Sequence, residues 1–242
     1  KKVFGITSNE NQLILLYQFT SYNETMLMPL LDLLFPKRCL GCQREGSHCC
    51  EDCFSLLSLS RAPSVIPARS SLSALFCATS FQDKFVQRLI HSFKYPPFLR
   101  DLAKPLAFSI IAHISLLNKP IYPPDVICPI PLHKSRLKWR GYNHAEELAK
   151  QLGLAFSLPV VTGALIRRKH TAPQVSLGRE ERLRNMKGVF EIRNPQAIRQ
   201  LADKNILLVD DVYTTGATME ECAKVLKKAG AARVFGAVVA RG

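Results

Sequence analysis

Two adjacent carboxylates, Asp210 and Asp211, precede the segment Thr214-Thr215-Gly216-Ala217-Thr218. Gly216 permits a close approach of the backbone to an anion, and free backbone N–H groups together with threonine hydroxyls can surround a phosphate. The two carboxylates would repel a phosphate but suit sugar hydroxyls, either directly or through Mg²⁺. These groups favour recognition of a sugar phosphate of the ribose 5-phosphate type.

The surroundings of this segment strengthen that interpretation. Residues 206–209 are all apolar, which predicts a strand buried on both faces and ending at Asp210. The segment then opens a predicted helix, whose N terminus favours an anion. It is not a Walker A loop, because no Gly-Lys-Ser/Thr follows. An isolated Asp-Asp would more simply cap a helix or a turn, but the full order of strand, acid pair, Thr-Thr-Gly and helix is more specific.

Four cysteines form two CxxC pairs near the N-terminal end: Cys39, Cys42, Cys50 and Cys53. Two such pairs can complete a tetrahedral Zn²⁺ site, and a closed four-thiolate site serves folding rather than catalysis. A redox pair and an iron–sulfur cluster are the alternatives. Cys49 or His48 could replace Cys50 as a ligand. The remaining cysteines lie in apolar contexts and are expected in the core: Cys77, Cys128 and Cys222.

Cations are concentrated in the middle of the chain. Residues 121–200 hold 14 lysines and arginines against six aspartates and glutamates, a local net charge of +8, within a total of +14. A concentrated basic face indicates a polyanionic ligand, although a solvated basic surface is the simpler alternative. The cations proposed to contact pyrophosphate or DNA are Lys134, Arg136, Lys138, Arg140 and Arg182. The segment 167–187 lacks apolar periodicity and could be a mobile lid. Trp139 and Tyr142 suit either the core or base stacking.

Strands and helices are expected to alternate. Strands are predicted at 74–79, 126–130, 206–209 and 234–239, and helices at 85–93, 102–117, 145–156 and 219–230. This order predicts an α/β fold, a parallel sheet with helices on both faces. The expected organisation is a poorly organised extension at 1–25, a zinc-binding module at 26–58, a Ser/Pro-rich linker at 59–72 and the α/β domain at 73–242. Asn143 is a candidate cap for the helix that begins near 145.

The acid pair and its loop resemble the signature of type I phosphoribosyltransferases, which bind phosphoribosyl diphosphate (PRPP). The resemblance implies that fold, a Mg²⁺-bound PRPP and displacement of pyrophosphate at the anomeric carbon. Asp210 and Asp211 would then be catalytic, because carboxylates can stabilise a cationic sugar in the transition state. Residues 214–218 would bind PRPP.

Further motifs resemble the ComF family of competence proteins: Pro131-Leu132-His133, Arg140-Gly141-Tyr142-Asn143, Thr171, Gln174, Arg182-x-x-Asn185 and Gly188-x-Phe190. The amino-terminal CxxC pairs, which would form a zinc-ribbon-like module, belong to the same pattern. The resemblance implies a role in handling internalised single-stranded DNA, with PRPP, single-stranded DNA and DNA-uptake proteins as partners. His144 replaces the usual Gln of the family, and Pro96-Pro97 occupies a position where Gly is usual.

Composition sets the remaining bounds. The hydrophobic content of 47% fits a globular core, and the apolar stretches at 13–19 and 26–35 are shorter than the roughly 20 residues that a membrane helix needs. With no convincing signal peptide, we expect the cytoplasm. Two other functions fit the same residues. One is a metabolic transferase that moves phosphoribose to a nucleobase or amine, and the other is a nucleic-acid-binding protein with a regulatory PRPP pocket. The sequence specifies no acceptor.

Overall fold

The computed structural model describes residues 2–3, 6–7, 36–61, 64, 66, 70–117, 122–168 and 185–242. Its strands are β1 (Lys2–Val3), β2 (Ile6–Thr7), β3 (Ala74–Ser80), β4 (Val126–Pro129), β5 (Leu165–Arg167), β6 (Phe190–Ile192), β7 (Asn205–Tyr213) and β8 (Arg233–Arg241). Its helices are α3 (Glu51–Ser55), α4 (Lys84–Lys94), the 3₁₀ turn η1 (Arg100–Leu102), α5 (Ala103–Leu116), α6 (Lys134–Arg140), α7 (His144–Phe156), α9 (Pro195–Leu201) and α10 (Ala217–Lys228).

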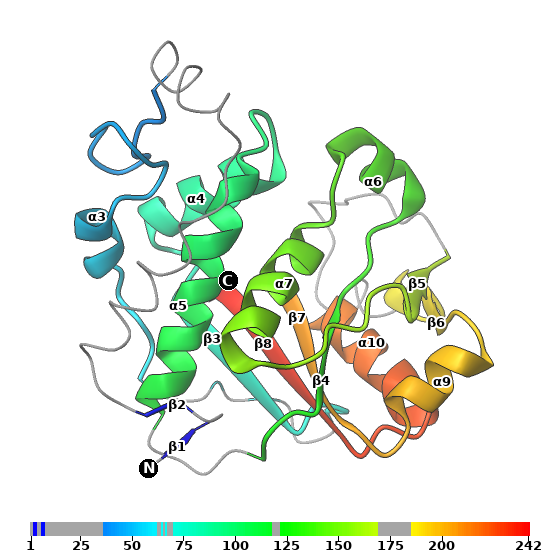
Figure 1. Cartoon of the computed structure of the whole chain (residues 1–242). Coiled ribbons are helices and arrows are strands. Elements are labelled where there is room, and N and C mark those ends of the chain that lie inside the picture. The colour runs from blue at the N-terminus through cyan, green and yellow to red at the C-terminus, as the bar shows by residue number, and fades with distance from the viewer. Residues whose placement is uncertain are drawn as a thin grey trace.

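The central sheet has four strands in the order β3-β8-β7-β4, and all three pairings are parallel. Leu207 of β7 lies between Phe235 of β8 and Ile127 of β4, which fixes the register across the middle of the sheet. The predicted parallel sheet is therefore confirmed (Figure 1).

The two faces of the sheet carry two separate apolar clusters. Residues of one parity, such as Leu207 and Val209, pack with α4, α5 and α7, whereas Ile206 and Leu208 pack with α9 and α10. This alternation follows from the period of two in a strand. Helices therefore cover both faces, as the apolar strand sequences predict.

Strand β7 is longer than predicted. It continues past Asp210 to Tyr213, because β8 is also long and pairs with it as far as Arg241. The prediction that the strand ends at Asp210 was therefore wrong. The consequence is geometric, since two adjacent residues within a paired strand point to opposite faces. By parity, Asp211 shares the face of Val209 and lies toward α4 and α7, while Asp210 lies toward α10.

Several elements were not predicted from the sequence, among them α6, β5, β6 and α9. Helix α6 fills part of the basic middle, because residues 134–140 contain neither Gly nor Pro; His133 caps its start and Gly141, at φ 83°, ends it. Strands β5 and β6 form an antiparallel pair, and α9 follows with Asn194 as its cap. Most of the segment expected to be a lid, 169–184, lies outside the described residues.

The cysteine-rich segment lies beside α4 and α5 (Figure 1). Cys49 is buried in the apolar cluster of this face, and Phe54 packs 5.4 Å from the ring of Phe108 on α5. Gly41 permits a close approach, since a Cβ there would lie 2.6 Å from Cys53 Sγ and 3.1 Å from the ring of Phe85 on α4. The described parts of 59–72 run along β3, where Ser64 N–H donates to the carbonyl of Leu75.

Candidate functional site

The acid pair lies at the carboxyl-terminal end of β7, the edge at which open α/β sheets bind ligands. Asp211 is 2% exposed, and Asp210 is half-buried. Asp210 Oδ1 accepts a hydrogen bond of 2.9 Å from the backbone N–H of Asp211. A buried carboxylate needs compensating partners, and two come from helices on the same face as Asp211.

Lys94, the last residue of α4, supplies the first partner. Its Nζ lies 2.7 Å from Asp211 Oδ2, and its side chain is 22% exposed. His144, the first residue of α7, supplies the second, with Nε2 at 3.3 Å from Asp211 Oδ2 and 3.5 Å from Asp210 Oδ1. Burial raises the pKa of Asp211, but His144 and the Lys94 ammonium outweigh it and hold this pKa below its ordinary value.

Arg140 fixes the role of His144. Its Nη1 lies 2.5 Å from His144 Nδ1. A guanidinium can only donate, so Nδ1 must accept and the proton of the neutral ring resides on Nε2. His144 therefore faces the two carboxylates with its Nε2–H side. The side chain of Arg140 is buried, and burial lowers its pKa while Asp211 raises it.

The predicted phosphate loop joins β7 to α10. Gly216 has φ 80°, and a Cβ there would lie 2.2 Å from the hydroxyl of Tyr213, so only glycine fits. No side chain caps the N terminus of α10, although Thr215 Oγ1 accepts a 3.4 Å bond from the N–H of Ala217. Thr214 is exposed, and Thr215 and Thr218 are half-buried. The loop thus presents hydroxyls and the first helical N–H groups beside the acid pair.

The predicted cations divide into three groups. Lys134 and Lys138 are exposed on α6, and Arg136 is half-buried. Arg140 instead faces the acid pair through His144. Arg182 lies outside the described residues.

Arg167, at the end of β5, extends the cationic surroundings of the acid pair. Burial lowers its pKa, and so does the like charge of Arg136, whereas Asp210 raises it. A cavity of about 710 Å³ lies alongside, between the segment after β4 and the β5–β6 pair. Its charged lining residues are Lys134, Glu146, Arg167, Arg168 and Arg193.

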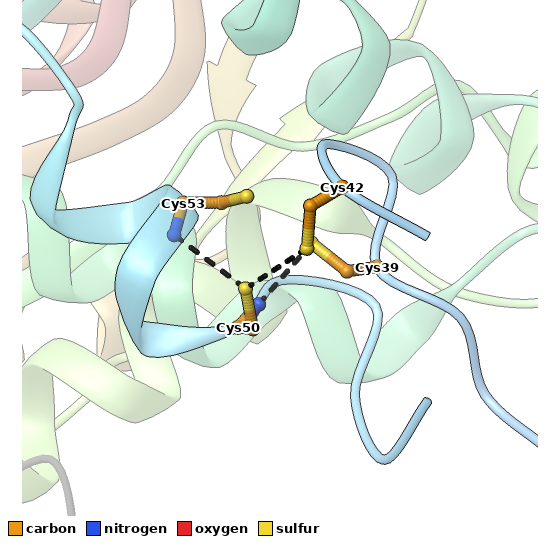
Figure 2. Close-up of side chains that lie close together, drawn as sticks. All are labelled: Cys39, Cys42, Cys50 and Cys53. Carbon is orange, nitrogen blue, oxygen red and sulfur yellow. Dashed lines mark hydrogen bonds between the residues drawn. The ribbon is translucent and has the colours of Figure 1, made fainter. Parts of the chain in front are cut away.

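The four predicted metal ligands converge, as Figure 2 shows. One Sγ atom from each of Cys39, Cys42, Cys50 and Cys53 lies within 4.8 Å of the others. Cys42 Sγ and Cys50 Sγ are 3.6 Å apart, close to the edge of about 3.8 Å that a tetrahedron with Zn–S distances of 2.3 Å requires. The N–H groups of Gly41 and Cys50 each lie 3.4 Å from Cys39 Sγ, to which they donate. The donor set and spacing fit a zinc ion.

Backbone hydrogen bonds also favour a thiolate at Cys39. Burial raises its pKa, but the N–H groups of Cys50, Cys42 and Gly41 lower it to about 6. Cys49 is different, since burial raises its pKa to about 12 and its side chain lies in the apolar cluster. His48 pairs with Asp101 at 2.7 Å. The structure therefore places Cys50, and neither Cys49 nor His48, in the four-thiolate cluster.

Comparisons with known proteins agree with these features. Residues 137–242 match the phosphoribosyl transferase domain. The chain is 36% identical to competence protein F of Haemophilus influenzae over 107 residues, which are 44% of this chain and 46% of that protein. It is 32% identical to the DNA utilization protein YhgH of Escherichia coli over 162 residues, 61% of this chain and 69% of that protein. Competence protein ComFC of Bacillus subtilis is 35% identical over 114 residues, which are 46% of this chain and 43% of that protein.

The chain belongs to the ComF family. The matched part spans about half the length of competence protein F and about two thirds of YhgH. In this ComF-family chain, Lys94 and the four cysteines lie outside the matched phosphoribosyl transferase domain. No helix in the described ranges is long and apolar enough to cross a bilayer.

Sequence reasoning missed two members of the site. Nothing local marks Lys94, since a lysine in the last turn of a helix is a common way to complement the dipole. His144 was noted only as a departure from the family pattern. Its position carried a signal, because a helix that begins after β4 places its first turn beside the adjacent strand β7. Trp139 and Tyr142 were predicted to suit either the core or base stacking. Tyr142 is buried, with its hydroxyl donating to the carbonyl of Phe93, whereas Trp139 is 57% exposed.

Proposed function

We propose that this ComF-family chain binds PRPP with Mg²⁺ at the acid pair and the loop 214–218. The observation that supports this most is the position of Asp210 and Asp211 near the end of β7, at the carboxyl edge of a parallel sheet, on the strand that a short loop joins to the uncapped N terminus of α10. The loop and the first turn of α10 would hold the 5-phosphate, and the carboxylates would accept hydrogen bonds from the ribose hydroxyls. Arg167, whose pKa the charge of Asp210 raises, would contact the diphosphate, because a guanidinium suits phosphate oxygens.

The carboxylates fit Mg²⁺ chemically, because hard oxygen ligands are those that Mg²⁺ prefers. Lys94 already neutralises Asp211, and His144 Nε2 lies 3.3 Å from the same carboxylate. Free Mg²⁺ should therefore bind weakly, and the ion would enter with the diphosphate. When bound, it would neutralise charge on the departing pyrophosphate. The chain's own part would be to orient the sugar and to stabilise positive charge at its anomeric carbon with Asp210 and Asp211.

We further propose that the four-thiolate cluster holds one structural Zn²⁺. The cluster has no open position, so its contribution is to fold residues 36–61 against α4 and α5. The proposed zinc-binding module at 26–58 includes residues that the structure does not describe, and its boundary with the linker stays a prediction.

The names of the relatives suggest the biological setting. They are a competence protein and a DNA utilization protein, and we propose that this chain acts in DNA uptake, binding single-stranded DNA in the cytoplasm beside DNA-uptake proteins. The exposed cations of α6, Lys134 and Lys138, support contact with a polyanion, because that helix carries no acidic residue.

A transferase acting in metabolism is the second candidate. The cavity of about 710 Å³ that Arg167 lines favours it, because that volume would accommodate an acceptor. A nucleobase or an amine would then take the phosphoribosyl group as pyrophosphate leaves.

Titration calorimetry separates these proposals. The protein is titrated with PRPP and Mg²⁺, and in a separate run with a short oligothymidylate. We expect heat of binding in both. Binding of PRPP without DNA would favour the metabolic transferase, and DNA without PRPP would favour a nucleic-acid-binding module. Pyrophosphate release on addition of a panel of nucleobases and amines would establish the acceptor, and absence of PRPP binding would contradict the proposal for the acid pair.

A further inference from the structure

Helix α4 borders a basic groove that lies outside the phosphoribosyl transferase match. The groove has a volume of about 720 Å³. Its lining includes the cations Lys84 and Arg88, together with His91 and with Lys94, which is paired with Asp211. No Asp or Glu is among the described residues that line it. Lys84, Arg88 and His91 are exposed. A concave surface lined by one sign of charge attracts a polyanion, because low-dielectric walls focus the field.

A row of aromatic rings continues from the end of this groove. The ring of His91 lies 4.9 Å from that of Tyr95, which lies 6.3 Å from that of Trp139. Phe98 closes the row, edge-on to Trp139 at 5.2 Å. Trp139 is 57% exposed and Tyr95 is 43% exposed. Two large aromatic side chains thus present ring surface to solvent at one place, supplied by two segments far apart in sequence.

On the other side of the aromatic row, the charges of α6 are also positive. Trp139 belongs to α6, which also presents Lys134 and Lys138. Beneath the row, the guanidinium of Arg140 lies 5.7 Å from the centre of the Tyr95 ring. Cations therefore lie on both sides of the exposed rings, at the groove and on α6.

We propose that the α4 groove and the aromatic row form a binding track for single-stranded nucleic acid, with bases stacked on Tyr95 and Trp139 and phosphates beside the flanking cations. This inference rests on the proposed DNA-handling function and adds a location for it. Stacked rings between cations suit unpaired bases, whose faces are available. A duplex offers no free base faces, and an anionic membrane surface would not enter a groove.

The track is joined to the acid pair by two neighbouring pairs of residues. Lys94 binds Asp211, and the next residue, Tyr95, belongs to the row. Arg140 binds His144, and the preceding residue, Trp139, belongs to the row. A strand on the track would therefore end beside the site proposed for PRPP, which makes the acid pair and the track adjacent parts of one surface.

The test uses the fact that Trp139 is the single tryptophan of the sequence. Its fluorescence should be quenched as oligothymidylate is added, because a stacked base contacts the indole. Inorganic polyphosphate, a polyanion without bases, should not quench it. By anisotropy with a labelled oligothymidylate, Tyr95→Leu and Trp139→Leu should each weaken binding about tenfold, in line with the loss of one stacked base. Arg88→Glu should weaken it as well.

Tyr122→Leu is the matched control. Tyr122 is also an exposed ring beside an arginine, with the guanidinium of Arg233 3.7 Å from its centre. It precedes β4 and so lies at the amino-terminal ends of the parallel strands, whereas the acid pair lies near their carboxyl-terminal ends. This variant should bind like the wild type. Normal binding by folded Tyr95→Leu and Trp139→Leu proteins, or equal quenching by polyphosphate, would overturn the track. No DNA binding by the wild type would instead contradict the proposed function, and the two failures are thus distinguishable.

Discussion

Lys94 and Asp211 form an ion pair of 2.7 Å that connects the end of α4 to the end of β7. Asp211 is buried, so loss of the ammonium would remove the cation nearest to its carboxylate and leave His144 Nε2 at 3.3 Å from Oδ2. A helix outside the matched phosphoribosyl transferase domain thereby contributes directly to its acid pair.

Lys94→Met should destabilise the fold, because removing one partner leaves a buried charge uncompensated. We expect a loss of about 3 kcal/mol in the free energy of unfolding, measured by urea denaturation. Lys84→Met is the control on the same helix, where the side chain is exposed, and should change this free energy by less than about 0.5 kcal/mol. Equal effects of the two substitutions would mean that the ion pair contributes no stability.

The same pair predicts a pH dependence. Burial raises the pKa of Asp211, but His144 and Lys94 lower it from 3.8 to about 2 in the folded protein. The unfolded chain therefore takes up the proton first as the pH falls, and the stabilisation, complete above pH 4 to 5, is lost toward pH 2. The difference in unfolding free energy between wild type and Asp211→Asn should shrink over this interval. A difference that does not change with pH would argue against a lowered pKa.

Replacing both members of the acid pair tests the proposed PRPP site. The Asp210→Asn, Asp211→Asn protein should lose PRPP–Mg²⁺ binding in calorimetry, because an amide does not supply the carboxylate charge or the metal ligands. Circular dichroism should show that the fold persists. Asp203→Asn, an exposed aspartate two residues before the start of the same strand, is the control and should bind normally. Unchanged affinity in the folded double variant would place PRPP elsewhere.

Metal analysis tests the cysteine cluster. We expect one Zn²⁺ per chain by mass spectrometry of the purified protein, and its loss in Cys39→Ser and Cys53→Ser. Cys49→Ala should retain the metal, because Cys49 packs in the apolar cluster rather than with the other four. Metal loss in that variant would move the ligand assignment, and an iron–sulfur absorption band would exclude zinc.

Binding of single-stranded DNA should depend on salt through α6. Log affinity should fall against log salt with a slope of about −0.7 per neutralised phosphate. Replacing Lys134 and Lys138 by Ala should reduce the slope by up to about 1.4 if each contacts one phosphate. Lys228→Ala, at the exposed end of α10, is a control for net charge and should leave the slope unchanged. The same slope in all three proteins would remove α6 from the interface.

The sequence predicted those parts of the site that neighbouring residues specify. The acid pair, the glycine of the phosphate loop and the CxxC pairs are local patterns with a direct chemical meaning, and the strands and helices around them are strongly apolar. Every residue expected on the inner face of α10, Met219, Cys222, Ala223 and Leu226, is buried.

What depends on contacts between distant segments could not be predicted in this way. The partnership of Lys94 with Asp211, and that of Tyr95 with Trp139, arises only when α4 packs on the sheet. The continuation of β7 past the acid pair depends on its pairing with β8 as far as Arg241. The sequence of β7 alone does not reveal this pairing. The residues next to Arg140 in the sequence predict a cation on the surface. In the structure, Arg140 at the end of the short helix α6 instead contacts His144.

The close approach of Gly41 to α4 places the cysteine cluster at one end of this helix, and the acid pair lies at its other end. Phe85 lies near the start of α4 beside Gly41 of the cysteine cluster, while Lys94 ends the same helix at the acid pair. Loss or oxidation of the thiolates would loosen the packing at one end of α4, whose other end supplies the ammonium that pairs with the buried Asp211. We therefore expect zinc starvation or oxidative stress to act on sugar-phosphate binding at a distance, without altering any residue of the binding loop.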